Sequence, residues 1–209
     1  AIVVPMRQPS LSVTQELVNK AQDGDSDAFG LLVERYRDRL EALLHLRMGP
    51  QLRRKVEVDD ALQETCVNAY RSLQRFRWVD DGSFFRWSAA VAEHTVQSLV
   101  RYHLRTEKRN PSRECSLDGA TRSSPDGEGQ VHIQLRDSGT SPSARLRRQE
   151  RLERLEASLD RILPDHREVI LLATIQGLPM REIAERMGRS RKAVSMLLVR
   201  ALRELRRRF

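Results

Sequence analysis

The feature that most constrains the fold is a pair of short amphipathic segments near the C-terminal end, EIAERMGRSRKAVSMLLVRALREL, residues 182–205. Gly188 separates the two segments, and a glycine can adopt the positive φ that ends a helix. Ser190 can then accept a hydrogen bond from a free N–H group at the start of the next helix. That helix would carry an apolar stripe at i, i+4, i+7 and i+11, formed by Val194, Leu198, Ala201 and Leu205. The pattern predicts two helices joined by a tight turn.

The second of these helices is predicted to have a basic face that points away from its apolar stripe. This face holds Lys192, Met196, Val199, Arg200 and Arg203, while Arg189 and Arg191 lie at the N-terminal end. In a helix-turn-helix, that end enters the major groove of DNA. We expect Arg191, Lys192 and Ser195 to read bases and Arg200 and Arg203 to contact phosphates. A plain helical hairpin with a solvated basic face is the alternative reading of this stretch.

The charge of the whole chain favours a polyanionic partner such as nucleic acid. Its 209 residues include 37 Lys and Arg against 29 Asp and Glu, a formal net charge of +8. Cys66 and Cys115 lie far apart without a metal-binding spacing, so neither a zinc site nor a disulfide framework is indicated. No stretch approaches the ~20 apolar residues of a membrane span. We therefore expect a cytoplasmic, nucleoid-associated protein that does not insert into membranes.

Helical periodicity recurs along the chain and strand signals are scarce, so the sequence predicts an all-α fold of two small helical domains. In the first domain, residues 11–109, helices are expected from Ser12 or Thr14 to Gln22, from Asp25–Asp27 through Leu44, from near Asp59 to Leu73, and from Ser83 towards Arg109. Residues 110–143 are rich in Pro, Gly and Ser and are predicted to form a flexible linker. The second domain, 144–209, begins with a helix that Pro164 breaks, and the helix-turn-helix ends it.

Polar side chains are expected to share one face of the third helix. Asp60, Gln63, Glu64 and Asn68 follow the spacing i, i+3, i+4 and i+8, opposite an apolar side. This face could dock a basic protein partner. Two alternatives are a solvated surface and a nuclease metal site formed by Asp59, Asp60 and Glu64, because hard cations bind clustered carboxylates.

Aromatic residues form only 5% of the chain, yet five of them are concentrated in residues 76–87. Phe84 and Trp87 lie on the apolar side of the fourth helix and are expected in the core. Trp78 and Phe85, with the loop at 80–83, are expected to stack on unpaired bases. Phosphate contacts are expected from basic residues further along, which include Arg101, Arg105 and Arg109. Single-strand capture beside duplex contacts predicts DNA melting.

The order of these features resembles the extracytoplasmic-function sigma factors of bacteria over nearly the whole chain. The opening of their region 2 is similar to AQDGDSDAFGLLVERYRDRL, and the region 2.2 pattern D-x-x-Q-E-x-F-x-x-A-[WY] is similar to DDALQETCVNAY. Regions 2.3 and 2.4 resemble SFFRWSAAVAEHTVQSLVR. Region 4 resembles LPDHREVILLATIQGLPMREIAERMGRSRKAVSMLLVRALREL. His94 and Ser98 differ from the usual Asn and Asp of the family, so promoter preference does not carry over.

The resemblance implies that region 2 binds the β′ clamp helices of core RNA polymerase and melts the minus-ten element, with His94 beside the minus-ten reading surface. It implies that region 4 reads the minus-thirty-five element and touches the β flap. An anti-sigma factor is a candidate further partner. No catalytic residue, metal or cofactor is expected in the sigma factor itself.

Two other functions compete with this one. A helix-turn-helix regulator that acts without core polymerase would explain residues 164–209 but not the aromatic cluster or the polar face at 60–68. A metal-dependent nuclease would use the acidic residues of that face.

Overall fold

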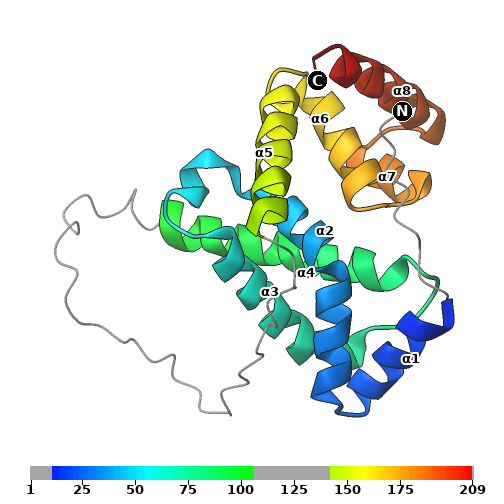
Figure 1. The fold of residues 1–209 in the computed structure, drawn as a ribbon. Helices are drawn as coiled ribbons and strands as arrows, with labels where there is room; N and C mark the ends of the chain where they lie inside the picture. The colour runs from blue at the N-terminus through cyan, green and yellow to red at the C-terminus, as the bar shows by residue number, and fades with distance from the viewer. Residues whose placement is uncertain (1–10, 106–141, 209) are drawn as a thin grey trace.

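The computed structural model describes residues 11–105 and 142–208, and within these ranges the regular structure is helical, with no strand. Figure 1 shows the helices α1–α4 of an N-terminal bundle and the helices α5–α8 of a C-terminal domain. The expected all-α fold with two helical domains is confirmed. The predicted linker, 110–143, lies outside the described residues except for its last two positions. No helix in the described ranges is both long and apolar enough to cross a membrane.

The N-terminal bundle consists of α1 (Leu11–Gln22), α2 (Ser26–Arg53), α3 (Val58–Ser72) and α4 (Ser83–Val100). Asp25 caps α2, since its Oδ1 accepts hydrogen bonds from the N–H groups of Asp27 and Ala28 at 2.9 and 3.0 Å. Neither Ser12 nor Thr14 caps α1, because α1 already begins at Leu11. Thr14 is instead buried, on the same helical face as Val18 and Ala21.

Helix α2 continues well beyond the predicted apolar segment and contains a kink. Gly49 has φ 67° and ψ 162°, and Pro50 follows it before the helix resumes to Arg53. Proline disfavours the α conformation in the residue before it, and glycine tolerates the positive φ that results. Leu46, before the kink, packs in the core of the C-terminal domain, whereas Leu52, after it, packs in the core of the bundle. Both cores therefore share α2.

The C-terminal domain consists of α5 (Pro142–Leu159), α6 (Pro164–Ile170), a π-helical turn η4 (Leu171–Ile175), α7 (Met180–Met187) and α8 (Arg191–Arg208). Pro164 does more than end the preceding helix, because it occupies the first turn of α6, where a missing N–H costs nothing. The core is formed by side chains from all four helices, among them Leu159, Val169, Ile183 and Val194.

Charged side chains join the two domains. Glu156 of α5 is buried and accepts hydrogen bonds from Arg53 Nη2, at 2.7 and 2.8 Å, and lies 3.1 Å from His45 Nε2. Arg47 of α2 reaches Glu168 of α6 at 2.6 Å and Glu93 of α4 at 3.1 Å. Burial and the neighbouring positive charge of Arg53 lower the pKa of His45, although Glu156 opposes the shift. The cluster thus favours the neutral form of the His45 imidazole.

Candidate nucleic-acid interface

The turn between α7 and α8 has the conformation that the sequence predicts. Gly188 has φ 63°, and its N–H donates to the carbonyl of Glu185 at 3.3 Å. The N–H of Arg189 donates to the carbonyl of Ala184 at 2.9 Å, which completes a Schellman motif. Ser190 Oγ accepts a hydrogen bond from the N–H of Ala193 at 3.2 Å, so Ser190 caps α8. The predicted helix-turn-helix is confirmed.

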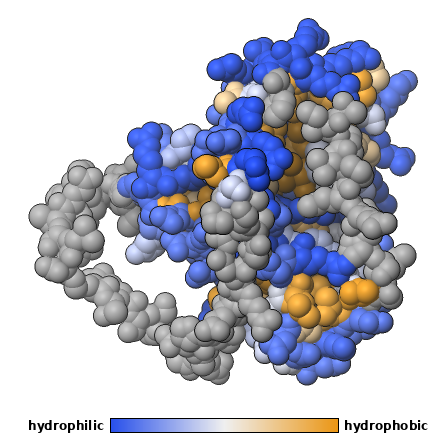
Figure 2. Space-filling model, in the orientation of Figure 1, coloured by the Kyte–Doolittle hydropathy of each residue, from blue (hydrophilic) through white to orange (hydrophobic). Residues whose placement is uncertain are grey.

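Helix α8 has one buried face and one exposed basic face. Val194 and Ala201 are fully buried against α6 and α7, with Leu198 and Leu205 half-buried beside them. All six residues predicted to contact the upstream promoter element are exposed: Arg189, Arg191, Lys192, Ser195, Arg200 and Arg203. Figure 2 shows hydrophilic side chains over the end of the molecule where α6 and α8 lie.

Most of these basic side chains are free to bind an anion. Within the ranges that the structure describes, no acidic side chain pairs with Arg191, Lys192, Arg200 or Arg203. Arg189 differs, because its guanidinium forms an ion pair with Asp165 at the start of α6. A phosphate would therefore compete with that carboxylate for the guanidinium of Arg189.

The polar face of α3 is open at three of its four predicted positions. Asp60, Gln63 and Glu64 are exposed. Loss of hydration raises the pKa of Glu64, and the nearby His103 opposes this shift. Asn68 is half-buried and donates from Nδ2 to Thr95 Oγ1 of α4 at 3.2 Å, so it connects two helices of the bundle. The expectation that Asn68 shares the exposed face is therefore wrong, because α4 packs over that end of α3.

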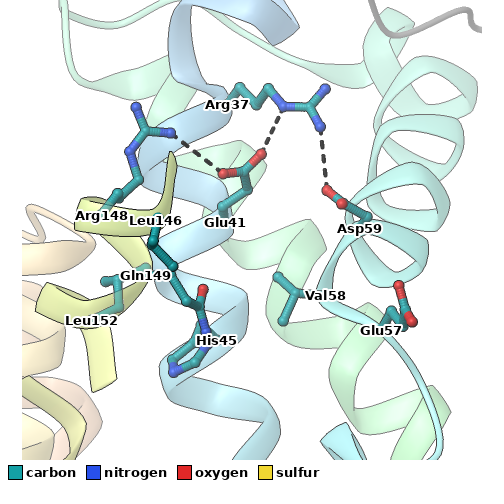
Figure 3. Close-up of a pocket in the computed structure, with 10 residues that line it drawn as sticks. All are labelled: Arg37, Glu41, His45, Glu57, Val58, Asp59, Leu146, Arg148, Gln149 and Leu152. Carbon is teal, nitrogen blue, oxygen red and sulfur yellow. Dashed lines mark hydrogen bonds and ion pairs between the residues drawn. The ribbon is translucent and has the colours of Figure 1, made fainter. Parts of the chain in front are cut away.

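Arginines engage Asp59 at the start of α3 and Glu41 of α2. Arg37 binds Glu41 at 2.6 Å and Asp59 at 3.2 Å, and Arg148 lies 3.7 Å from Glu41. Figure 3 shows Glu41 between the two guanidinium groups. These residues line a cavity of about 490 Å³ between α2, α5 and the start of α3. Among the residues described, no three His, Cys, Asp or Glu side chains are grouped as metal ligands. The geometry gives no support to the nuclease alternative.

Phe85 does not lie where the sequence analysis expected it. Its side chain is only 1% exposed, its ring stacks on Tyr36 with centroids 5.8 Å apart, and the guanidinium of Arg39 lies 3.7 Å from its centroid. Phe85 therefore belongs to the core and cannot stack on a base. The helical spacing from Phe85 to Ala89, Ala92, Val96 and Leu99 could have revealed this, because all five share the buried face of α4.

Trp78 and the loop that follows it remain available. Trp78 is half-buried against the core of the bundle, and Val79 beside it is 77% exposed, a residue that the sequence analysis did not single out. Asp80 holds the loop together, since both of its carboxylate oxygens accept hydrogen bonds from Arg86 Nη2 at 2.7 Å. The bond from Arg86 keeps the pKa of Asp80 below its usual value. The loop thus presents Val79 and part of Trp78 on a fixed backbone.

The other residues expected near the minus-ten element are only partly described. His94 is exposed on α4. Arg101, in the π-helical turn η2 (Arg101–Arg105), is exposed and donates to Ser98 Oγ at 3.2 Å. The backbone of Arg105 lies in the same turn, but its side chain is outside the described part of the chain, as is the whole of Arg109.

Comparisons with known proteins connect both halves of the chain with transcription. The family model described as sigma-70 region 2 matches residues 32–109, and the one described as sigma-70, region 4 matches residues 158–207. The ECF RNA polymerase sigma-E factor of Haemophilus influenzae is 31% identical over 173 residues, which cover 82% of each protein. The ECF RNA polymerase sigma factor BldN of Streptomyces coelicolor is 28% identical over 197 residues, 92% of this chain and 64% of that protein.

A solved structure also shares the fold. CnrH, determined in complex with the cytosolic domain of CnrY, superimposes with a TM-score of 0.53 at 24% sequence identity. The match covers 92% of this chain and 94% of CnrH.

Proposed function

Because this chain belongs to the ECF RNA polymerase sigma factors, we propose that it is an alternative initiation factor that binds core RNA polymerase and directs it to specific promoters. One observation carries this proposal. The two matched regions present two separate surfaces, an exposed polar face on α3 and an exposed basic helix in a helix-turn-helix. A regulator that acts without polymerase needs only the second surface.

We assign residues 11–109 to region 2, 110–143 to a linker and 144–209 to region 4. Asp60, Gln63 and Glu64 would contact the polymerase directly, while Asn68 would support that face through its hydrogen bond to Thr95. Trp78 would stack on an unpaired base of the minus-ten element, with His94, Arg101, Arg105 and Arg109 along the path of the strand.

In region 4, we assign base contacts to Arg191, Lys192 and Ser195 and phosphate contacts to Arg200 and Arg203, because the N-terminal end of the recognition helix enters the groove most deeply. Arg189 would bind phosphate once Asp165 releases it. The protein performs no catalysis in this proposal, since the polymerase supplies the chemistry. Its place of action is promoter DNA in the nucleoid.

The test is to add the purified chain to bacterial core polymerase and map the transcripts that start. We expect initiation at a defined set of promoters. The double variant Gln63→Ala, Glu64→Ala should lose core polymerase in a pull-down while its circular dichroism stays native. The control is Gln15→Ala, Glu16→Ala, a matched and exposed pair on α1. If core polymerase makes the same transcripts with and without the chain, and the chain alone binds DNA sequence-specifically, the result would favour a helix-turn-helix regulator that acts without polymerase.

A further inference from the structure

Two large apolar side chains are exposed on an otherwise strongly basic helix. Met196 is 51% exposed and Val199 is 45% exposed, and within the described residues they are the most exposed large apolar side chains of α8. Single exposed apolar residues are common on protein surfaces and need no explanation. These two, however, lie one helical turn apart on the same face.

The position of this pair on α8 is defined by the helical spacing. Lys192, Met196, Val199 and Arg203 follow i, i+4, i+7 and i+11, so they form one stripe about 16 Å long. This stripe points away from the buried Val194 and Ala201, which face α6 and α7. The apolar pair is therefore at the centre of the surface that a groove would meet, between Lys192, assigned above to a base, and Arg203, assigned to a phosphate.

The chemistry of the major groove fits such a pair at one kind of base. The C5-methyl of thymine is the apolar group that the base edges present there, and apolar side chains recognise it by contact. Neither Met196 nor Val199 can donate a hydrogen bond, so guanine at the same place would lose water from O6 and N7 without replacement. The two residues are about 4.5 Å apart along the helix axis, close to the rise of about 3.4 Å between base pairs.

We propose that Met196 and Val199 are specificity-determining residues that select thymine at two neighbouring base pairs of the upstream promoter element, through van der Waals contact with the C5-methyl groups. The inference rests on the proposed function, because it needs α8 to enter the major groove. It adds a class of contact, apolar and methyl-directed, to the charged and polar contacts assigned above.

The test replaces thymine by deoxyuridine, which removes only the methyl group. Holoenzyme assembled from this chain and core polymerase is first used to find a promoter and its upstream element by transcript mapping. Each thymine of that element is then replaced singly, and affinity is measured by competition. We expect a loss of about fourfold at each of two neighbouring base pairs, the effect of exposing about one methyl group.

The variants assign each position. Met196→Ala should bind the thymine and deoxyuridine forms equally at one of the two positions, and Val199→Ala should do so at the other. Leu146→Ala, which removes a side chain that is 61% exposed on α5, is the control and should keep both preferences. Wild-type holoenzyme that is indifferent to deoxyuridine throughout the element would overturn the inference, as would a preference that persists in both variants. Loss of core binding by Met196→Ala or Val199→Ala, without methyl sensitivity in the wild type, would show that the pair docks on protein instead. Failure of the proposed function would appear earlier, as an absence of promoter-specific transcripts.

Discussion

Replacing Phe85 by alanine should destabilise the protein strongly without removing a DNA contact. The side chain is 1% exposed, and Phe→Ala changes at such sites cost about 3–5 kcal/mol. The ring also stacks on Tyr36 and lies under the guanidinium of Arg39. Both contacts would be lost, so we expect the free energy of unfolding to fall by about 4–5 kcal/mol, the upper half of that range. At roughly 2–4 °C per kcal/mol for a chain of this size, Tm should fall by about 8–20 °C.

The assay pairs urea unfolding, followed by circular dichroism, with permanganate reactivity of unpaired thymines in the open complex. At a temperature where Phe85→Ala is still folded, we expect holoenzyme with this variant to melt the promoter as the wild type does. Trp78→Ala is the matched control, because Trp78 is only half-buried. It should lose less stability than Phe85→Ala but form open complexes slowly, and a pre-melted template should restore its rate. A stability loss below about 1 kcal/mol for Phe85→Ala, combined with defective melting, would refute the assignment of Phe85 to the core.

Three further outcomes are expected. Gly188→Ala should lower the free energy of unfolding by about 1–2 kcal/mol in urea titrations, because alanine is strained at φ 63°; an unchanged midpoint would contradict the turn geometry. Burial and Arg53 lower the pKa of His45 in the folded protein. As the pH falls, the unfolded chain therefore binds a proton at this histidine before the folded chain does, near the ordinary pKa of 6.5. The free energy of unfolding should thus fall as the pH drops below that value. His45→Gln should flatten this part of the pH profile, and an identical profile would show that the histidine does not contribute. Arg191→Ala should flatten base preference at one or two base pairs of an upstream-element library, whereas Arg203→Ala should weaken all sequences alike and reduce the salt slope by about one; equal, sequence-blind losses would mean that α8 only holds the backbone.

The features that sequence alone predicted are those set by local chemistry. The end of α7 at Gly188 and the start of α8 at Ser190 depend on residues within one helical turn, and the structure has both. The apolar stripe from Val194 to Leu205 likewise follows from spacing along a single helix. Local signals of this kind are strong because few other conformations satisfy the same residues.

The errors concern burial by a distant element. Thr14 looks like a helix cap in sequence, but α1 starts earlier and packs the residue into the bundle. Asn68 has the spacing of an exposed face, yet α4 crosses the end of that face and accepts its hydrogen bond. Phe85 lies among other aromatic residues in sequence, but its helical register with Ala89 and Ala92 places it on the buried face of α4. The ion pairs between α2 and the C-terminal domain join residues more than 100 positions apart, and no local pattern indicates them.

Those ion pairs also affect how tightly the protein can bind its partners. Minus-ten and minus-thirty-five elements are about 25 base pairs apart, or about 85 Å of duplex. A compact chain of 209 residues has a radius of gyration of about 17 Å, so one packed molecule cannot contact both elements. Under the proposed function, binding at a promoter therefore draws on an extended population in which Glu156 has left Arg53 and His45, and Arg47 has left Glu168. Each tenfold shift of the free protein towards the packed form then raises the apparent Kd for the promoter complex tenfold, although neither binding surface has changed.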